Sequence, residues 1–373
     1  MHILTAKIKD CDSLHIMPSA RQSVRNYVMI EQFSRKIEVK MINMGIVGYG
    51  NVGKACEKIA LGDRDINVVG VFTRRNPSEV QTGCKKVYSA IDLPKFKGKI
   101  DVLLLCVGSA FDLTDTALAL AKDFNTVDSF DTHSKMAEYA QKLNSIAVDN
   151  GRLCYFGIGW DPGLFSLCRA LFSSVFPNCD VQTFWGKGVS QGHSEAIRKI
   201  DGVLLAKQYT VPKENALKEA REGRGQLLSV RDKHLRECYV VAKEGANKAV
   251  IEDKIKNMPD YFAPYDTIVH FISKEEFEKE HGNSPHGGFV LASGDSRGEK
   301  CNLELSLKTQ SNPHFTASVL VAYAKANAMA YQNGDRGAKS VIDIPISYLC
   351  EGEWIDKIGR FISTIIENKV NWL

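Results

Sequence analysis

A G-x-G-x-x-G motif begins at Gly48, directly after an apolar run that ends at Val47. In such a motif the first glycine permits a tight turn, the second lets the backbone approach a pyrophosphate, and the third lets the next helix lie close to the strand. The helix N-terminus adds free N–H groups and positive potential. The alternative is a glycine-rich turn without a ligand. The residues expected to contact a dinucleotide here are Gly48, Tyr49, Gly50, Asn51, Val52 and Gly53.

The end of the second apolar run indicates which dinucleotide this is. Proteins that use NAD usually carry an acidic residue there, which binds the ribose hydroxyls. This chain has Thr73, Arg74 and Arg75 instead. Two guanidinium groups and a hydroxyl suit a 2′-phosphate, so we expect NADP(H); the alternative is a pair of solvated surface arginines. The residues expected on the other side of the cofactor crevice are Val107, Gly108 and Ser109.

Two aspartates follow later strand candidates in loops rich in glycine. Asp131 ends the sequence Asp128-Ser-Phe-Asp131, and Asp161 lies in Gly159-Trp-Asp-Pro-Gly163. Because such loops carry the ligands of open α/β sheets, both carboxylates could point into one crevice and hold a cationic amino group. The alternative for Asp161, which precedes Pro162, is a simple turn residue.

A carboxylate could be held by Arg236 or Arg198, together with Thr210 and His286. Taken alone, each of these residues is as often structural, and His286 could be an ordinary loop histidine. His281 and His286 have no obvious third partner, so no metal site is expected.

Strands and helices alternate from residue 41 onward, which predicts an α/β fold with a doubly wound, Rossmann-type parallel sheet. The strands expected in this sheet are 41–47, 66–73, 101–107, 126–128 and 153–158. Half-polar strand candidates after residue 160 predict a second, α+β domain with an antiparallel or mixed sheet. We therefore expect a dinucleotide-binding domain at 41–159, completed by about 314–373, and a substrate-binding and dimerisation domain at 160–313. Residues 1–40 are expected to form a weakly ordered extension.

The composition of the 373 residues is that of a globular protein, with 44% hydrophobic and 25% charged residues. It excludes a mostly disordered chain or a collagen-like fibre. The net charge of +4 argues against a nucleic-acid-binding stripe. The ten cysteines form no C-x-x-C pair, which is typical of reduced thiols. With no membrane span and no secretory signal in the sequence, the cytoplasm is the expected location.

Several longer motifs resemble those of the meso-diaminopimelate D-dehydrogenase family. The resemblance runs from Met41 to about Leu349 and is most specific in the second domain. The motifs are GIVGYGNVGKA from Gly45, TRR at Thr73, LLLCVGSA from Leu103, VDSFDTH from Val127, GWDPGLFS from Gly159, TFWGKGVSQGHSEAIRKI from Thr183, NMPDYF from Asn257, PHGG at Pro285 and NPHFTAS at Asn312.

The resemblance implies an NADP-dependent oxidative deamination. The D-centre of meso-2,6-diaminopimelate becomes a ketone, giving L-2-amino-6-oxopimelate, ammonium and NADPH, in a reversible step of lysine and cell-wall precursor synthesis. It also implies a homodimer. The alternatives are a related NADP-linked D-amino acid dehydrogenase or imine reductase, and a non-catalytic, dimeric NADP sensor.

The resemblance also assigns roles to residues of this chain. Asp131 and Asp161 hold the reacting amino group, and we add the hypothesis that one of them accepts its proton. The positions implied to bind the rest of the substrate are Trp160 and Gly163 at the reacting centre, Thr210, Arg236 and His286 at the distal carboxylate, and Trp185 and Asn312 around the pocket.

Overall fold

A computed structural model describes residues 41–108, 112–176, 178–259, 261–296, 298–350, 352 and 354–362. Residues 42–349 form one unit, which holds every described residue of the expected site. The expected N-terminal extension at 1–40 lies outside the described residues, as does Ser109.

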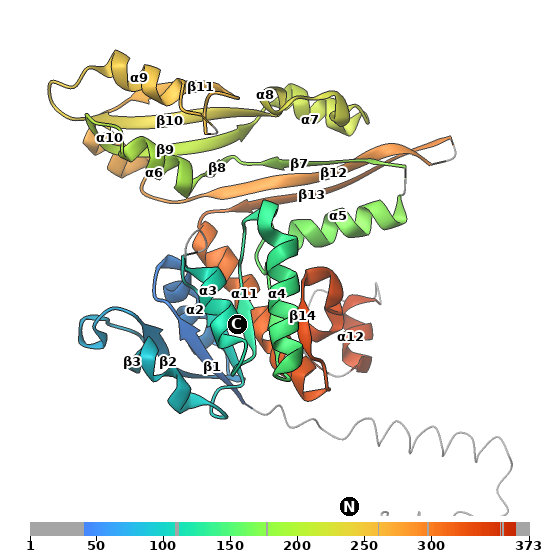
Figure 1. Cartoon of the computed structure of the whole chain (residues 1–373). Helices are drawn as coiled ribbons and strands as arrows, with labels where there is room; N and C mark the ends of the chain where they lie inside the picture. Colours follow the sequence, from blue (N-terminus) through green and yellow to red (C-terminus); the bar gives the residue numbers. More distant parts are fainter. Residues whose placement is uncertain are drawn as a thin grey trace, which may run out of the picture. The chain divides into compact units, whose positions relative to one another are not determined.

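A seven-stranded sheet lies in the first part of this unit, and all its strand pairs are parallel. Its order is β14-β6-β5-β4-β1-β2-β3 (Figure 1). The strands are β1 (Ile42–Val47), β2 (Ile66–Thr73), β3 (Val87–Ser89), β4 (Val102–Leu105), β5 (Thr126–Asp128), β6 (Leu153–Tyr155) and β14 (Gly337–Lys339). The predicted Rossmann-type sheet is confirmed.

Both faces of this sheet are buried, because alternate residues of its apolar strands enter two different hydrophobic clusters. In β4, Leu104 joins one cluster, while Leu103 and Leu105 join the other. The first cluster includes residues of α2 (Asn51–Leu61) and α11 (Asn312–Gln332), and the second those of α3 (Leu113–Leu120) and α4 (Met136–Asp149). One pair of helices therefore covers each face (Figure 1).

The strand order reverses between β1 and β4. From β1 the chain proceeds outward to β2 and β3, and from β4 it proceeds the other way through β5 and β6. Ligands of open parallel sheets bind at such a switch point, beyond the carboxyl ends of the strands. The expected phosphate turn follows β1, and Asp131 and Asp161 lie in the loops after β5 and β6.

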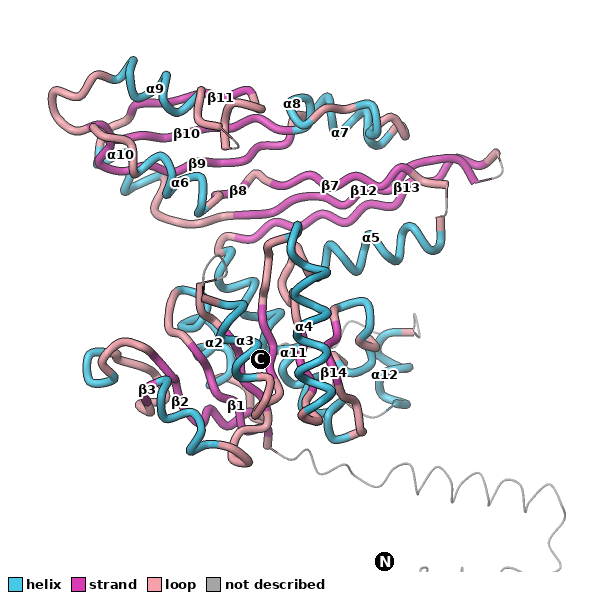
Figure 2. The backbone as a smooth tube through the Cα atoms, viewed as in Figure 1, coloured by secondary structure: helices cyan, strands magenta, loops and turns pink. Residues whose placement is uncertain are grey.

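Two further sheets follow where a single one was expected. The first has the antiparallel order β13-β12-β7, and the second has the mixed order β11-β10-β9-β8, in which only β10 and β11 are parallel (Figure 2). Their strands are β7 (Asp180–Trp185), β8 (Gly188–Val189), β9 (Val203–Pro212), β10 (His234–Ala242), β11 (Asp266–Phe271), β12 (His286–Ser296) and β13 (Glu299–Thr309).

The remaining helices connect and cover these sheets. They are α5 (Leu164–Val175), α6 (Gln191–Arg198), α7 (Glu214–Arg221), α8 (Val230–Lys233), α9 (Lys248–Lys256) and α10 (Lys274–Glu280), while α12 (Trp354–Phe361) lies beyond residue 349. Helix α5 packs against β7 and β12, and α11 packs against α2 and the parallel sheet (Figure 1). The domain boundaries remain a prediction. No helix among the described residues is long and apolar enough to cross a membrane.

Candidate active site

The turn between β1 and α2 leaves backbone uncovered for a phosphate. Gly48 has a φ of +90°, and a Cβ atom there would lie 2.7 Å from the carbonyl oxygen of Cys106. A Cβ on Gly53 would lie 2.3 Å from the carbonyl oxygen of Gly48, whereas one on Gly50 would meet nothing within 4 Å. Only glycine therefore fits at positions 48 and 53, where neighbouring backbone atoms lie too close for a Cβ atom. The space over Gly50 is open at the start of a helix, as binding of a pyrophosphate requires.

A buried carboxylate fixes the side chain at the centre of this turn. The Tyr49 hydroxyl donates to Glu57 of α2 at 2.6 Å, and the backbone N–H groups of Gly83 and Cys84 donate to the same carboxylate at 3.0 Å each. Burial alone would raise the pKa of Glu57, but the hydrogen bonds from Cys84, Tyr49 and Gly83 outweigh it and lower that pKa. The carboxylate therefore ties the turn to the connection between β2 and β3.

The two arginines after Thr73, the last residue of β2, have different partners. Arg75 donates from Nη2 to the carbonyl oxygen of Tyr49 at 2.8 Å, so it lies beside the phosphate turn. Arg74 makes two hydrogen bonds to Asp112, at 3.0 and 2.6 Å, and this ion pair is exposed. Both terminal nitrogens of Arg74 thus donate to Asp112, a partner that the sequence did not indicate. Val107 and Gly108 follow β4, on the other side of the switch point.

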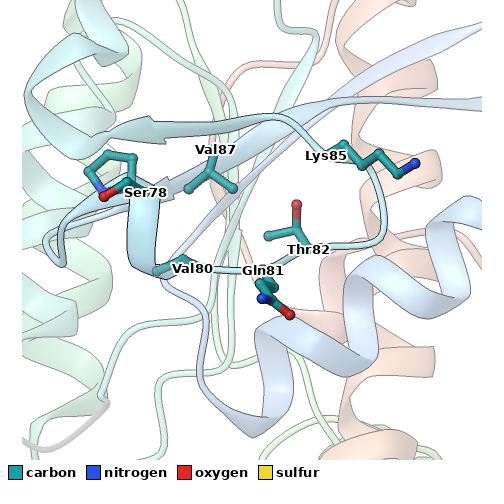
Figure 3. Close-up of a pocket in the computed structure, with 7 residues that line it drawn as sticks. Ser78, Val80, Gln81, Thr82, Lys85 and Val87 are labelled. Carbon is teal, nitrogen blue, oxygen red and sulfur yellow. The ribbon is translucent and has the colours of Figure 1, made fainter.

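An open pocket of about 540 Å³ lies in the connection from β2 to β3, and Figure 3 shows its lining side chains. They include Ser78, Thr82 and Lys85. None of the residues predicted for the site lines it, although it begins two positions after Arg75.

Asp161 is held by two partners that the sequence analysis did not name together. Its carboxylate is 1% exposed; Oδ1 accepts from Arg169 at 2.6 Å and Oδ2 accepts from the indole N–H of Trp185 at 2.6 Å. Arg169 lies on α5 and also donates to Ser166 at 3.0 Å and Thr183 at 3.1 Å. This network joins the loop after β6 to the end of β7. Asp131, in contrast, is exposed, and no contact in the described part of the chain links it to Asp161.

Three more predicted residues lie together. The indole N–H of Trp160 donates to Oδ1 of Asn312 at 2.9 Å, and its ring lies 4.6 Å from that of His286. The Nδ1 atom of His286 lies 2.8 Å from the backbone nitrogen of Gly287 and 3.1 Å from its carbonyl oxygen. Burial lowers the pKa of His286, against the opposing effect of the Gly287 hydrogen bond. A neutral imidazole carries one ring N–H, which can donate to a carboxylate.

Arg236 is a buried cation without an acidic partner among the described residues. It is 7% exposed, and it lies opposite Thr210 in the register of β9 and β10. Its Nη1 donates to the Thr210 hydroxyl, its guanidinium carbon lies 3.8 Å from the centre of the Tyr265 ring, and its Nε has no hydrogen-bond partner. Burial lowers the pKa of Arg236. Arg198, the other arginine considered, is paired with Glu195 at 2.6 Å.

Gly188 of β8 lies between the group around His286 and the pair of Thr210 and Arg236. It pairs with Thr210, and a Cβ atom built on it would lie 2.5 Å from the His286 ring. The described structure thus links Trp160, Asn312 and His286 with Thr210 and Arg236, and separately links Asp161 with Trp185. Gly163 begins α5 beside the first group, where it forms a β-bridge with Trp160.

Sequence reasoning missed five residues of this region. Each of them contacts a predicted residue through the fold rather than through a spacing that the sequence shows, although Gly188 lies within the motif that begins at Thr183. They are Glu57, Asp112, Arg169, Gly188 and Tyr265. The described part of the chain contains no cluster of three or more His, Cys, Asp or Glu side chains that could hold a metal.

Comparison with known proteins identifies the family of the chain. The family model for the diaminopimelic acid dehydrogenase C-terminal domain matches residues 159–311. A meso-diaminopimelate D-dehydrogenase from Ureibacillus thermosphaericus is 50% identical over 310 residues, which cover 83% of this chain and 95% of that protein. The chain belongs to the meso-diaminopimelate D-dehydrogenase family. The resemblance predicted from the sequence motifs is confirmed.

Solved structures of the family show the same fold. A six-substitution variant of the Clostridium tetani meso-diaminopimelate dehydrogenase with DAP is 43% identical to this chain, with a TM-score of 0.80. An engineered D-amino acid dehydrogenase bound to NADP⁺ is 38% identical, with a TM-score of 0.75. Each comparison covers 86% of this chain and 99% of the other. The roles of individual site residues in this chain remain predictions.

Proposed function

We propose that this chain catalyses the NADP-dependent, reversible oxidative deamination of the D-centre of meso-2,6-diaminopimelate, giving L-2-amino-6-oxopimelate and ammonium. Arg236 is the observation that carries the proposal. Burying an unpaired charge costs several kcal/mol. A buried arginine without an acidic partner is therefore expected to bind an anionic ligand. The Thr210 hydroxyl, which accepts from Arg236, and the ring N–H of a neutral His286 can each donate to an anion at the same place. This group of residues fits the distal carboxylate of the substrate.

The cofactor is NADP⁺, which accepts a hydride when bound. The turn at Gly48 to Gly53 fits its pyrophosphate because the backbone over Gly50 is uncovered. Arg75 lies beside that turn, and Arg74 can join it once it separates from Asp112. These two side chains would hold the 2′-phosphate, which NAD⁺ lacks.

The reacting amino group must lose a proton before its nitrogen can help expel the hydride. Both oxygens of Asp161 already accept hydrogen bonds from Arg169 and Trp185. Asp131 is exposed in the loop after the neighbouring strand, and no hydrogen bond to it is formed by the described residues. We therefore assign proton acceptance to Asp131, directly or through water, and positioning of the amino group to Asp161.

Single substitutions test this division of roles. Asp131→Asn should lower kcat and remove the acid limb of its pH profile, whereas Asp161→Asn should mainly raise KM for the substrate. If both variants only weakened substrate binding and left the hydride step and its pH profile intact, the acid–base role would be wrong.

The function itself is tested by supplying NADP⁺ with meso-diaminopimelate and, in parallel, with D-amino acids that have one carboxylate. Because Arg236 needs a distal anion, turnover should be confined to the dicarboxylic substrate. Equal rates on monocarboxylic D-amino acids would favour the broader D-amino acid dehydrogenase. Absence of NADPH formation with every substrate would favour the non-catalytic sensor.

We also propose a cytoplasmic homodimer. The nine described cysteines are free thiols, which is typical of a reducing compartment. Strand β13 is an eleven-residue edge strand with one described neighbour, and such an edge can pair with a second copy. Light scattering should give twice the chain mass of 41.4 kDa. A mass equal to that of one chain would contradict the dimer.

A further inference from the structure

Asp128, which has no role in the account above, is a fully buried carboxylate between the loops that carry the two site aspartates. It is the last residue of β5 and is 0% exposed. Its Oδ1 accepts from the backbone N–H groups of Phe130 at 2.9 Å and Gly157 at 3.3 Å, and its Oδ2 accepts from the Tyr139 hydroxyl at 2.6 Å. Three donors from three segments therefore converge on one side chain.

The two backbone donors belong to the two strand-end loops. Phe130 directly precedes Asp131, and Gly157 lies four residues before Asp161. The carbonyl oxygen of Asp128 also accepts from the N–H of Ile158 at 2.8 Å. One residue thus fixes the direction in which the chain leaves both β5 and β6, and with it the separation of the two aspartates.

No cation among the described residues pairs with Asp128. The titratable groups that face it are Tyr139 from α4 and Cys154 from β6. The Tyr139 ring stacks on Phe130 with 4.3 Å between centroids. Burial raises the pKa of Asp128 to about 6, against the opposing hydrogen bonds from Tyr139, Phe130 and Gly157. Burial of a carboxylate costs stability, and the three donors that offset part of this cost belong to segments that their hydrogen bonds also hold in place.

We propose that Asp128 is a positioning residue for the deamination: its carboxylate clamps the loops after β5 and β6, so that Asp131 and Asp161 face the same reacting centre. This inference rests on the proposed function. It concerns the substrate side of the crevice alone, because the phosphate turn and Arg75 follow β1 and β2. Misplacement of reacting groups by about 1 Å can cost about 100-fold in rate.

Three variants and one control test the clamp. Asp128→Ala removes all three acceptor contacts, Asp128→Asn keeps an oxygen for the two backbone donors, and Tyr139→Phe removes the third donor alone. The control is Asp149→Asn, at the exposed end of α4. Each protein is titrated with NADP⁺ to count binding-competent sites, and kcat and KM for meso-diaminopimelate are expressed per site.

The clamp predicts that Asp128→Ala lowers kcat per NADP⁺-binding site at least about tenfold and raises KM, with the Kd of NADP⁺ within about twofold of the parent. Asp128→Asn and Tyr139→Phe should show smaller losses, and Asp149→Asn none. Unchanged kcat and KM per site in Asp128→Ala would overturn the proposal, as would an equal loss of NADP⁺ affinity, which indicates general unfolding. If Asp128→Ala binds no NADP⁺, Asp128→Asn decides by the same criterion.

Hydrogen exchange separates failure of the clamp from failure of the proposed function. If the parent protein does not oxidise meso-diaminopimelate, the proposed function is wrong, but the clamp still predicts faster amide exchange at Phe130 and Gly157 in Asp128→Ala. Exchange at these two amides that matches the parent would show that Asp128 orders neither loop.

Discussion

Replacing Arg236 with leucine should separate substrate binding from stability. A hydrogen bond to a charged group contributes about 1.5–3 kcal/mol. Because 1.4 kcal/mol is tenfold in affinity, loss of the contact to the distal carboxylate should raise KM for meso-diaminopimelate about 10- to 150-fold. The Kd of NADP⁺ should not change, since Arg236 lies on β10, away from the phosphate turn.

The same substitution should not destabilise the free protein. Burial of the unpaired guanidinium costs several kcal/mol. Its bond to Thr210 returns about 1.5–3 kcal/mol, and the Tyr265 ring 3.8 Å away returns about 2 kcal/mol. These terms nearly cancel. We therefore expect the free energy of unfolding to stay within about 1 kcal/mol of the parent or to rise, as leucine removes the buried charge.

Urea denaturation of the substrate-free parent and variant gives their free energies of unfolding, provided that the free energy falls with urea concentration at the same slope in both proteins. Initial rates at varied substrate give KM. Arg198→Leu is the matched control, because that arginine is already paired with Glu195 and should leave KM unchanged. A loss of more than 3 kcal/mol in stability together with an unchanged KM would show that Arg236 serves the fold rather than the substrate.

Three other outcomes are expected. Arg74→Ala with Arg75→Ala should abolish the preference for NADP⁺ over NAD⁺ in kcat/KM. Gly53→Ala should weaken NADP⁺ binding, since its Cβ would lie 2.3 Å from the carbonyl oxygen of Gly48 and displace the phosphate turn, and it should lower the free energy of unfolding by about 1–3 kcal/mol. Burial, with smaller effects from Arg236 and Lys233, lowers the pKa of His234 from 6.5 to about 4. As the pH falls, the unfolded chain therefore binds a proton at His234 before the folded protein does, and the free energy of unfolding should fall by about 2 kcal/mol between pH 7 and pH 5. The variant His234→Gln should not show this loss.

Each of these predictions has a control and a contrary result. Exposed Arg64→Ala should keep the cofactor preference, and an unchanged ratio in the double variant would remove both arginines from the 2′-phosphate site. Gly62→Ala, at the other end of α2, should leave NADP⁺ affinity intact, whereas normal affinity in Gly53→Ala would contradict the close approach of helix and strand. Parallel stability curves for His234→Gln and the parent below pH 6.5 would show that His234 is not buried as a neutral ring.

The parallel sheet could be predicted because the information is local. Each apolar run is short, is bounded by turn residues and has a period that buries both faces. The second run was placed at 66–73, as β2 is observed. The strand β6 is shorter than the run expected at 153–158: it ends at Tyr155, where its neighbour β14 ends too, and the N–H of Phe156 makes the last bond between the two strands, to the carbonyl oxygen of Lys339. That partner is far along the chain, and no pattern near residue 156 indicates it.

The arrangement of the candidate site could not be predicted in full, because it depends on contacts between residues whose proximity the sequence does not indicate. The indole of Trp185 reaches Asp161 only because α5 returns the chain to β7 beside the loop after β6. Arg74 finds Asp112, 38 residues away, across the switch point. The division of the second region into two sheets likewise depends on which half-polar strands pair, and several pairings satisfy the same pattern.

The most direct test of the central claim is the rate of NADP⁺ reduction with each diaminopimelate stereoisomer supplied separately. A distal carboxylate and amino group of L configuration, held at Arg236, leave a D-centre at the nicotinamide only in the meso form. Rapid NADPH formation with the meso isomer and almost none with the LL isomer is the predicted result. Equal turnover of the LL and meso isomers would contradict the account.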